Sequence, residues 1–197
     1  NERFWNLLAP DLENPENLQD FYPSSATAAS AEKSATANYI IITTSSIQSN
    51  SSKLSSFISH KRSRGFNVAV ITEGTEADDS HYLSGSDTSS RAENIRSWLR
   101  SRYLDWEIEY VLLVGDPNPS SFIAAWSIPM MMCFNWDSGG GRYWECPTDM
   151  YYAELSGDWD NDGDGYPGEF NGDFGSGGID RNCELAVGRI PYYGSVA

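Results

Sequence analysis

Residues 39–44 read Tyr-Ile-Ile-Ile-Thr-Thr, a short β-branched run without a charged residue. Runs of this kind are typical of strands that a parallel sheet buries on both faces. Residues 66–72 (Phe-Asn-Val-Ala-Val-Ile-Thr) and residues 109–115 (Glu-Tyr-Val-Leu-Leu-Val-Gly) have the same character. The sequence therefore predicts three strands of one buried sheet.

Segments with helical spacing separate these strands. One helix is predicted over residues 50–64, and a second from a capping box of Ser90 and Glu93 to about Leu104. Strand–helix–strand–helix–strand spacing implies right-handed crossovers and a parallel sheet. We therefore expect an α/β fold of the Rossmann or caspase-like type, a three-layer sandwich with a mainly parallel sheet.

The pattern changes after the third strand. Residues 149–155 (Asp-Met-Tyr-Tyr-Ala-Glu-Leu) and 184–190 (Glu-Leu-Ala-Val-Gly-Arg-Ile) both alternate like strands, and we predict that they form an antiparallel pair. Residues 128–133 are a further candidate for a short buried strand.

The connection between the two predicted antiparallel strands is acidic. Residues 158–169 read D-W-D-N-D-G-D-G-Y-P-G-E and satisfy the calcium-loop pattern, although neither flank reads as an EF-hand helix. Calcium takes six to eight oxygen ligands, which alternating carboxylates around a tight glycine turn can supply. The sequence predicts a calcium site, the alternative being a solvated acidic turn. The candidate ligands are Asp158, Asp160, Asp162 and Glu169 through side chains and Asp164 through its backbone carbonyl.

Charge and composition exclude some classes of function. The formal net charge is −15, and residues 145–184 contain eleven acidic residues and one basic residue. Nucleic-acid binding, which needs clustered Lys and Arg, is therefore not expected. No apolar run approaches the roughly 18–20 residues of a membrane span. A composition rich in Ser, Thr, Asn and Gly, together with a calcium loop, favours a secreted or extracellular protein.

Two parts of the chain differ in composition. Residues 1–37 are predicted to be an N-terminal extension that ends in a Ser/Ala-rich linker. Residues 38–197 are predicted to form a single α/β subdomain that includes the calcium loop at 158–169.

The cysteines and histidines do not suggest a catalytic pair. One disulfide is possible, between Cys133 and Cys146, which leaves Cys183 over. No two cysteines have the C-x-x-C spacing of a zinc site. His60, near the end of the first predicted helix, and His81, in a polar loop, are both expected at the surface.

Two aspartates stand at positions where functional residues are often found. Asp116 follows the third strand at its carboxyl end, and the Pro117 after it favours an Asx-type turn over a catalytic role. Asp149 is expected to hold its loop closed. We therefore predict no catalytic residue in this sequence.

The order and spacing of several segments resemble the first half of the gingipain-like cysteine peptidase domain. The resemblance covers residues 38–192 and rests on Y-I-I-I-T-T, E-Y-V-L-L-V-G-D, P-T-D-M-Y-Y-A-E-L-S-G-D-W-D and the closing L-A-V-G-R-I-P. One departure is Ser45-Ser46-Ile47, where the family usually has a Phe after the first strand.

The resemblance implies a caspase-like fold with two consecutive subdomains, often with bound calcium. In that family the catalytic His, in a Gly-His-Gly turn, and the catalytic Cys, at a strand end, both belong to the second subdomain, and this sequence contains neither motif. It therefore implies a non-catalytic first subdomain, inactive alone. Its partner would be the C-terminal catalytic half of a cysteine endopeptidase, through which protein or peptide substrates are bound.

Two alternatives remain open at this point. The first is a calcium-binding extracellular interaction module without proteolytic activity. The second is a doubly wound receiver-like or ligand-binding domain. It is disfavoured because the turn after the first strand has no phosphate-binding glycine pattern.

Overall fold

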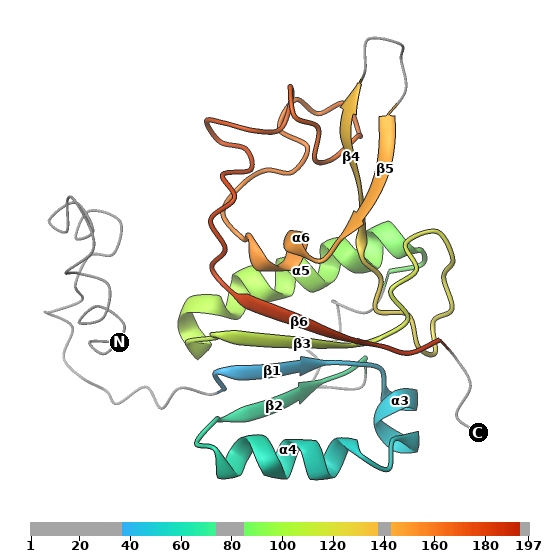
Figure 1. Cartoon of the computed structure of the whole chain (residues 1–197), viewed down its shortest axis with the longest axis vertical. Coiled ribbons are helices and arrows are strands. Elements are labelled where there is room, and N and C mark those ends of the chain that lie inside the picture. Colours follow the sequence, from blue (N-terminus) through green and yellow to red (C-terminus); the bar gives the residue numbers. More distant parts are fainter. Residues whose placement is uncertain (1–36, 74–84, 138–142, 194–197) are drawn as a thin grey trace, which may run out of the picture. The chain divides into compact units, whose positions relative to one another are not determined.

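The computed structural model describes residues 37–73, 85–137 and 143–193 (Figure 1). His81 and the predicted N-terminal extension, except for Ala37, lie outside these ranges. No helix within them is long and apolar enough to cross a membrane. The elements in chain order are β1 (Tyr39–Ile42), α3 (Ser45–Asn50), α4 (Leu54–Ser63), β2 (Val68–Ile71), α5 (Thr88–Trp106), β3 (Tyr110–Gly115), β4 (Met131–Asp137), β5 (Tyr143–Thr148), α6 (Met150–Ala153) and β6 (Ala186–Pro191).

Four parallel strands form the main sheet, in the order β2-β1-β3-β6. One of the two inner strands, β1, pairs in parallel with both β2 and β3 over all four of its residues. These are the three strands predicted from apolar runs, and the prediction of a parallel α/β fold is confirmed. The fourth strand, β6, pairs with β3 from Ala186 opposite Tyr110 to Pro191 opposite Gly115.

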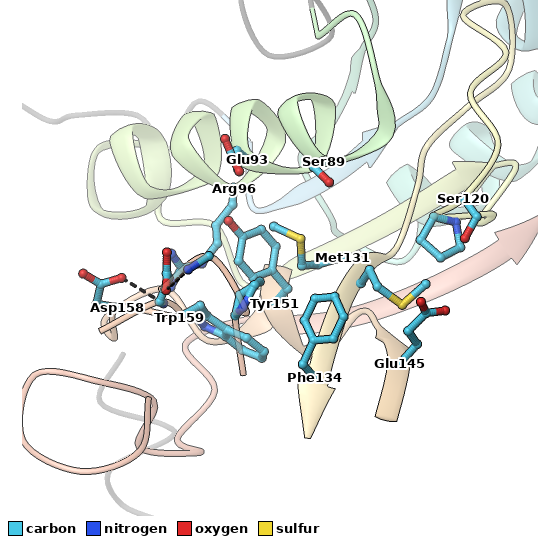
Figure 2. Close-up of a pocket in the computed structure, with 15 residues that line it drawn as sticks. Ser89, Glu93, Arg96, Ser120, Met131, Phe134, Glu145, Tyr151, Asp158 and Trp159 are labelled. Atoms are coloured by element: carbon cyan, nitrogen blue, oxygen red, sulfur yellow. Dashed lines mark hydrogen bonds between the residues drawn. The ribbon is translucent and has the colours of Figure 1, made fainter. Parts of the chain in front are cut away.

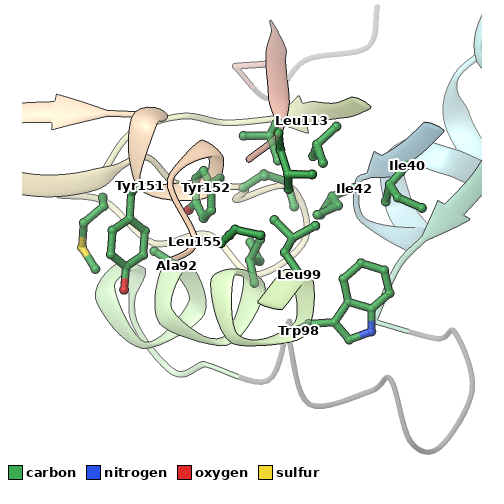
Figure 3. Close-up of a cluster of buried hydrophobic side chains, with 14 of the residues drawn as sticks. Ile40, Ile42, Ala92, Trp98, Leu99, Leu113, Tyr151, Tyr152 and Leu155 are labelled. Carbon is green, nitrogen blue, oxygen red and sulfur yellow. The ribbon is translucent and has the colours of Figure 1, made fainter. Parts of the chain in front are cut away.

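Alternate side chains of β1 enter two separate cores, one on each face of the sheet. Ile40 and Ile42 belong to the core that Leu99 of α5 also enters (Figure 3). Ile41 belongs to the core on the other face, which Leu54 of α4 enters. The sheet is therefore the middle layer of the predicted three-layer sandwich, with α5 on one face and α4 on the other.

The helix starts differ from those predicted. The N-cap of α5 is Asp87, whose Oδ1 accepts from the backbone N of Ser90 at 2.9 Å. Ser90 is thus the N3 residue that closes the capping box and not its N-cap, because a carboxylate stands one turn earlier. The first predicted helix corresponds to α4, which begins at Leu54, four residues later than predicted. The helix α3 before it was not predicted, and Thr44 caps it by accepting from the backbone N of Ile47.

The predicted antiparallel pairing of 149–155 with 184–190 is wrong. The antiparallel pair is β4 with β5, where Met131 lies opposite Thr148. Met150–Ala153 is instead the short helix α6, in which consecutive residues Tyr151, Tyr152 and Ala153 are all buried. A strand would bury only alternate residues on one face, whereas a helical turn packed into a core can bury all three. The segment at 184–190 supplies β6 and extends the parallel sheet.

Among the described residues, no helix covers one face of β6. Ala186, Gly188 and Ile190 are exposed, and they pair with β3 residues that lie on the α4 side of the sheet. Figure 1 shows β6, drawn in red, at the edge of the sheet far from β2 and α4. Parallel strands are normally covered on both faces, so this part of the sheet is unusually open.

Gly115, at the end of β3, is predicted to tolerate no side chain. A Cβ there would lie 2.5 Å from Cγ1 of Ile128 and 2.8 Å from the carbonyl oxygen of Trp126. Gly115→Ala should therefore lower the free energy of unfolding by about 1–3 kcal/mol, measured by urea denaturation. Gly188→Ala is the control, because its Cβ would meet only Leu112 at 3.9 Å, and we expect a change within about 0.5 kcal/mol. Equal destabilisation by both variants would contradict the prediction.

Candidate metal site

The acidic loop that joins α6 to β6 begins at a buried ion pair. Oε2 of Glu154, a fully buried residue, lies 3.4 Å from Nη2 of Arg96 on α5. The same guanidinium donates to the carbonyl oxygens of Glu154 at 2.9 Å and Gly157 at 2.8 Å. The Glu154 carboxylate accepts from the backbone N of Gly157 and from Nε1 of Trp159, both at 2.6 Å. Helix α5 thereby fixes the first residues of the loop.

A second carboxylate, Asp173, holds the two ends of the loop together. Its side chain is fully buried, and Oδ1 accepts from the backbone N of Asn161 at 2.6 Å. Oδ2 accepts from the backbone N of Gly168 at 2.7 Å and of Glu169 at 3.0 Å. These three bonds place the aspartate run and Glu169 on either side of one carboxylate.

Hydrogen bonds from backbone N–H groups that are near in the sequence shape the aspartate run itself. Oδ1 of Asp158, Asp162 and Asp164 each accepts from the backbone N two residues further on, at 3.1, 3.3 and 2.9 Å. Oδ1 of Asp160 accepts from the backbone N of Gly165 at 3.0 Å. Each of these four bonds uses one oxygen of its carboxylate, and the run forms a series of tight turns.

The turns bring most of the predicted ligands together, in two overlapping groups. In the first group, carboxylate oxygens of Asp162, Asp164 and Glu169 all lie within 4.8 Å of one another. In the second group, carboxylate oxygens of Asp160, Asp162 and Asp173 also all lie within 4.8 Å of one another, so Asp162 belongs to both groups. Asp158, also a predicted ligand, is in neither group.

Asp173 is the candidate ligand that the sequence analysis missed. The calcium-loop pattern ends at its twelfth position, Glu169, four residues before Asp173. A signal was present, because Asp173 stands alone as an acidic residue among glycines in N-G-D-F-G. Only in the folded structure does Asp173 lie against the aspartate run.

The environment of Glu169 would suit a nearby cation. Its side chain is buried, at 8% exposure, and Oε2 has no hydrogen-bond partner among the described residues. Burial, a hydrogen bond with Asp164 and the nearby charges of Asp164, Asp162 and Asp173 raise the pKa of Glu169 to about 7. A buried carboxylate oxygen without a donor is costly, and a cation placed among these groups would offset that cost.

The chemistry of the donors fits a hard divalent cation. Every member of both groups is a carboxylate, and no cysteine or histidine belongs to either group. Oxygen-only sets of this kind suit calcium, manganese or magnesium more than zinc or copper. Calcium accepts irregular coordination, whereas magnesium demands near-octahedral geometry. An irregular loop rich in carboxylates therefore fits calcium best.

A cavity of about 600 Å³ lies beside this loop. In Figure 2 it is bounded by α5, by the β4–β5 pair and by the start of the acidic loop. Neither His60 nor any of the three cysteines lines it. The combination of carboxylates with aromatic rings suits a positively charged group better than an anion. Its charged and aromatic lining residues are Glu93, Arg96, Phe134, Glu145, Tyr151, Asp158, Trp159 and Asp160.

The thiols have the environment of structural cysteines. Burial, then the neighbouring Cys146 and Asp173, raise the pKa of Cys133 to about 12. Partial burial and the carboxylates of Glu184, Glu154 and Asp180 raise the pKa of Cys183. A nucleophilic cysteine needs the opposite, a lowered pKa near positive charge. His60 lies in the last turn of α4, on the face of the sheet opposite to the core of Cys133.

The two aspartates singled out from the sequence have structural partners. Oδ1 of Asp116 accepts from the backbone N of Asn118 at 3.0 Å, which is the Asx-type turn that was predicted. Both oxygens of Asp149 accept from Arg189 of β6, from Nε and Nη2 at 2.7 Å. This bidentate pair ties the start of α6 to the last strand, and neither aspartate faces a nucleophile.

Comparison with known proteins identifies the family. The model of Peptidase family C25 matches residues 32–194 of the 197 residues. No curated protein and no solved structure gives a significant match. The matched range includes every described element and the whole acidic loop. The chain therefore belongs to Peptidase family C25, the gingipain family of cysteine peptidases.

Proposed function

We propose that this chain is the non-catalytic N-terminal subdomain of a secreted cysteine endopeptidase. In this proposal calcium stabilises the subdomain, which supports a separate half carrying the catalytic His and Cys. Family membership supports the peptidase activity of the whole protein. The observation that carries the non-catalytic role is that His60, on α4, lies on the face of the sheet opposite to the core of Cys133. The raised pKa of Cys133 and of Cys183 agrees with it, because a nucleophilic cysteine needs a lowered pKa.

Calcium has a structural role in this proposal. Asp162, Asp164 and Glu169 would hold the ion, and Asp160 and Asp173 could complete the site or hold a second one. The ion would neutralise the carboxylates that crowd Glu169 and keep the loop attached to β4. That attachment is visible as a hydrogen bond of 2.9 Å from the backbone N of Phe134 to the carbonyl oxygen of Pro167.

The uncovered face of β6 is the surface that we propose for the catalytic half. Ile190 is 48% exposed on this face and Tyr110 of β3 is 37% exposed, with Ala186 and Gly188 beside them. Small and apolar residues on an open sheet face suit a packed interface more than contact with water. Substrates would be bound by the catalytic half and would contact this chain only near the interface between the two.

Peptidase assays test the proposal. Alone, the chain should cleave no member of a peptide panel, with or without a reducing agent. Mixed with the separately produced His/Cys half, it should restore thiol-dependent cleavage. Ile190→Asp should reduce that restored activity at least tenfold, because a buried unpaired charge at the interface is costly. Leu104→Asp is the matched control, since Leu104 is 80% exposed on α5.

Each outcome separates the proposal from its alternatives. Cleavage by the chain alone that disappears in Cys183→Ala would show that the catalytic centre is in this chain. Failure of the two halves to combine would favour a calcium-binding interaction module without proteolytic activity. The secreted location rests on composition, and its test is whether the protein is found in the medium of the cells that produce it.

A further inference from the structure

Two of the three cysteines lie directly opposite each other on the β4–β5 pair. Cys133 of β4 is the register partner of Cys146 of β5. Opposite residues of an antiparallel pair project their side chains on the same face, with Cβ atoms about 4.5–5.5 Å apart. The two thiols are close enough that Cys146 affects the charge state of Cys133 electrostatically. We propose that Cys133 and Cys146 form a reversible disulfide that locks the hairpin beneath the acidic loop.

The hydrogen-bond pattern of the pair sets the backbone separation. Pro147 has no N–H, so its pairing with Met132 cannot be a hydrogen-bonded pair. The backbone N of Phe134 donates to Pro167, away from β5, so Phe134 and Glu145 are not a hydrogen-bonded pair either. Because the two kinds of pair alternate, Cys133 and Cys146 are hydrogen-bonded, with Cα atoms about 5.5 Å apart.

That separation suits a disulfide. Bridged cysteines have Cα atoms about 4.4–6.8 Å apart, most often about 5.5–6 Å, and Cβ atoms about 3.5–4.5 Å apart. Closing the bond therefore needs the two Cβ atoms to approach by about 1–2 Å and no change of register. Cys133 and Cys146 are not bridged in this structure.

The two thiols differ in access, which sets the order of the reaction. Cys146 is exposed, whereas Cys133 is 5% exposed. A small disulfide such as oxidised glutathione is the oxidant. The Cys146 thiolate attacks one of its sulfurs, forms a mixed disulfide and releases one glutathione. Cys133 then attacks Sγ of Cys146 through its small thiolate fraction, and its raised pKa makes this step slow near neutral pH. Its proton passes to the departing glutathione thiolate, and a second glutathione leaves. Two thiols are oxidised and one glutathione disulfide is reduced.

The proposed disulfide lies next to the acidic loop and would affect how firmly that loop is held. Cys133 lies against Gly168, where a Cβ would be 2.9 Å from Cβ and 3.3 Å from Sγ of Cys133. Gly168 precedes Glu169 of the first carboxylate group, and the backbone N of Phe134 donates to the carbonyl oxygen of Pro167. The disulfide would therefore fix the strand that carries one side of the loop. Cys183 lies before β6, outside this hairpin, and takes no part.

Thiol counting after oxidation tests the assignment. The folded chain is equilibrated with oxidised glutathione, unfolded without a reductant, alkylated and analysed by mass spectrometry. We expect a linked pair of peptides containing Cys133 and Cys146, with Cys183, which is also exposed, either alkylated or carrying glutathione. Cys183→Ser should give the same linked pair. Cys146→Ser, at an exposed position, should leave Cys133 alkylatable.

Three results would overturn the proposal. They are alkylation of all three cysteines after oxidation, a linked pair that includes Cys183, and glutathione that remains attached to Cys146. Oxidation of the chain unfolded in urea is the control for geometry, because it should yield a mixture of pairings. A single pairing in the unfolded chain would mean that the fold does not select it. These readouts need neither peptidase activity nor calcium, so they are independent of the proposed function.

Discussion

Calcium is expected to raise the melting temperature of this chain by about 5–10 °C over the value in a chelator. An ion that binds only the folded chain adds about 2.7 kcal/mol at a hundredfold excess over its Kd. For 150–250 residues, each kcal/mol corresponds to about 2–4 °C. The stabilisation arises because Asp162, Asp164 and Glu169 repel one another in the metal-free loop, where one oxygen of Glu169 also has no donor. Calorimetric or fluorescence melting in both conditions measures it.

Two variants test whether the ion is bound by the two carboxylate groups of the structure or by the positions of the calcium-loop pattern. Asp162 belongs to both carboxylate groups, so Asp162→Asn should abolish most of the calcium-dependent rise in melting temperature. Asp158 is the first position of the calcium-loop pattern but belongs to neither group, so Asp158→Asn should leave most of that rise in place. If Asp158→Asn is the more damaging variant, the ion is bound as in the sequence pattern. If wild type melts at one temperature in both conditions, the loop is an acidic turn.

Magnesium provides a further comparison within the same experiment. It needs near-ideal octahedral geometry and loses its water reluctantly, so it should produce a much smaller rise than calcium at equal concentration. Sodium at matched ionic strength controls for the screening of a chain with a net charge of −15. A rise of equal size with all three salts would indicate charge screening without a specific site.

The parallel sheet could be predicted because its evidence is local. Each of the first three strands is an apolar run, and Ile40, Ile41 and Ile42 are all fully buried because a parallel sheet covers both faces. Helical spacing between the runs then leaves few alternatives for the topology. The alternation of the aspartates was equally local, and four of the five candidate ligands that it named have carboxylates in the two groups. Asp164 is one of them, although it was expected to contribute its backbone carbonyl, and calcium binding itself stays a prediction.

Two of the remaining errors concern contacts that a local sequence pattern does not encode. Residues 149–155 alternate like a strand, but the burial of three consecutive residues depends on a core built by α5 and β4. Asp173 joins the site only because its oxygens bind the backbone of Asn161 and Gly168. The start of α5 was missed for a local reason, since Asp87 is an equally good N-cap one turn earlier.

The buried pair of Arg96 and Glu154 should be the most costly side-chain interaction to break in the described part of the chain. Glu154→Ala is expected to lower the free energy of unfolding by about 3–5 kcal/mol, because it leaves the Arg96 guanidinium buried without its carboxylate. The backbone N of Gly157 and Nε1 of Trp159 would lose the same acceptor. Urea denaturation with and without calcium measures the loss.

Two further variants separate the charge of Glu154 from its hydrogen bonds. Ser156→Ala removes only the 2.7 Å bond from Ser156 Oγ to Glu154 Oε1, and should cost about 0.5–1.5 kcal/mol. Glu154→Gln keeps the shape and one acceptor but removes the charge, so we expect a loss between those of the other two variants. Because the pair fixes the start of the acidic loop, Glu154→Ala should also weaken calcium binding in titration calorimetry, whereas Ser156→Ala should not. A loss below about 1 kcal/mol for Glu154→Ala would mean that water replaces the carboxylate, and that α5 does not anchor the loop.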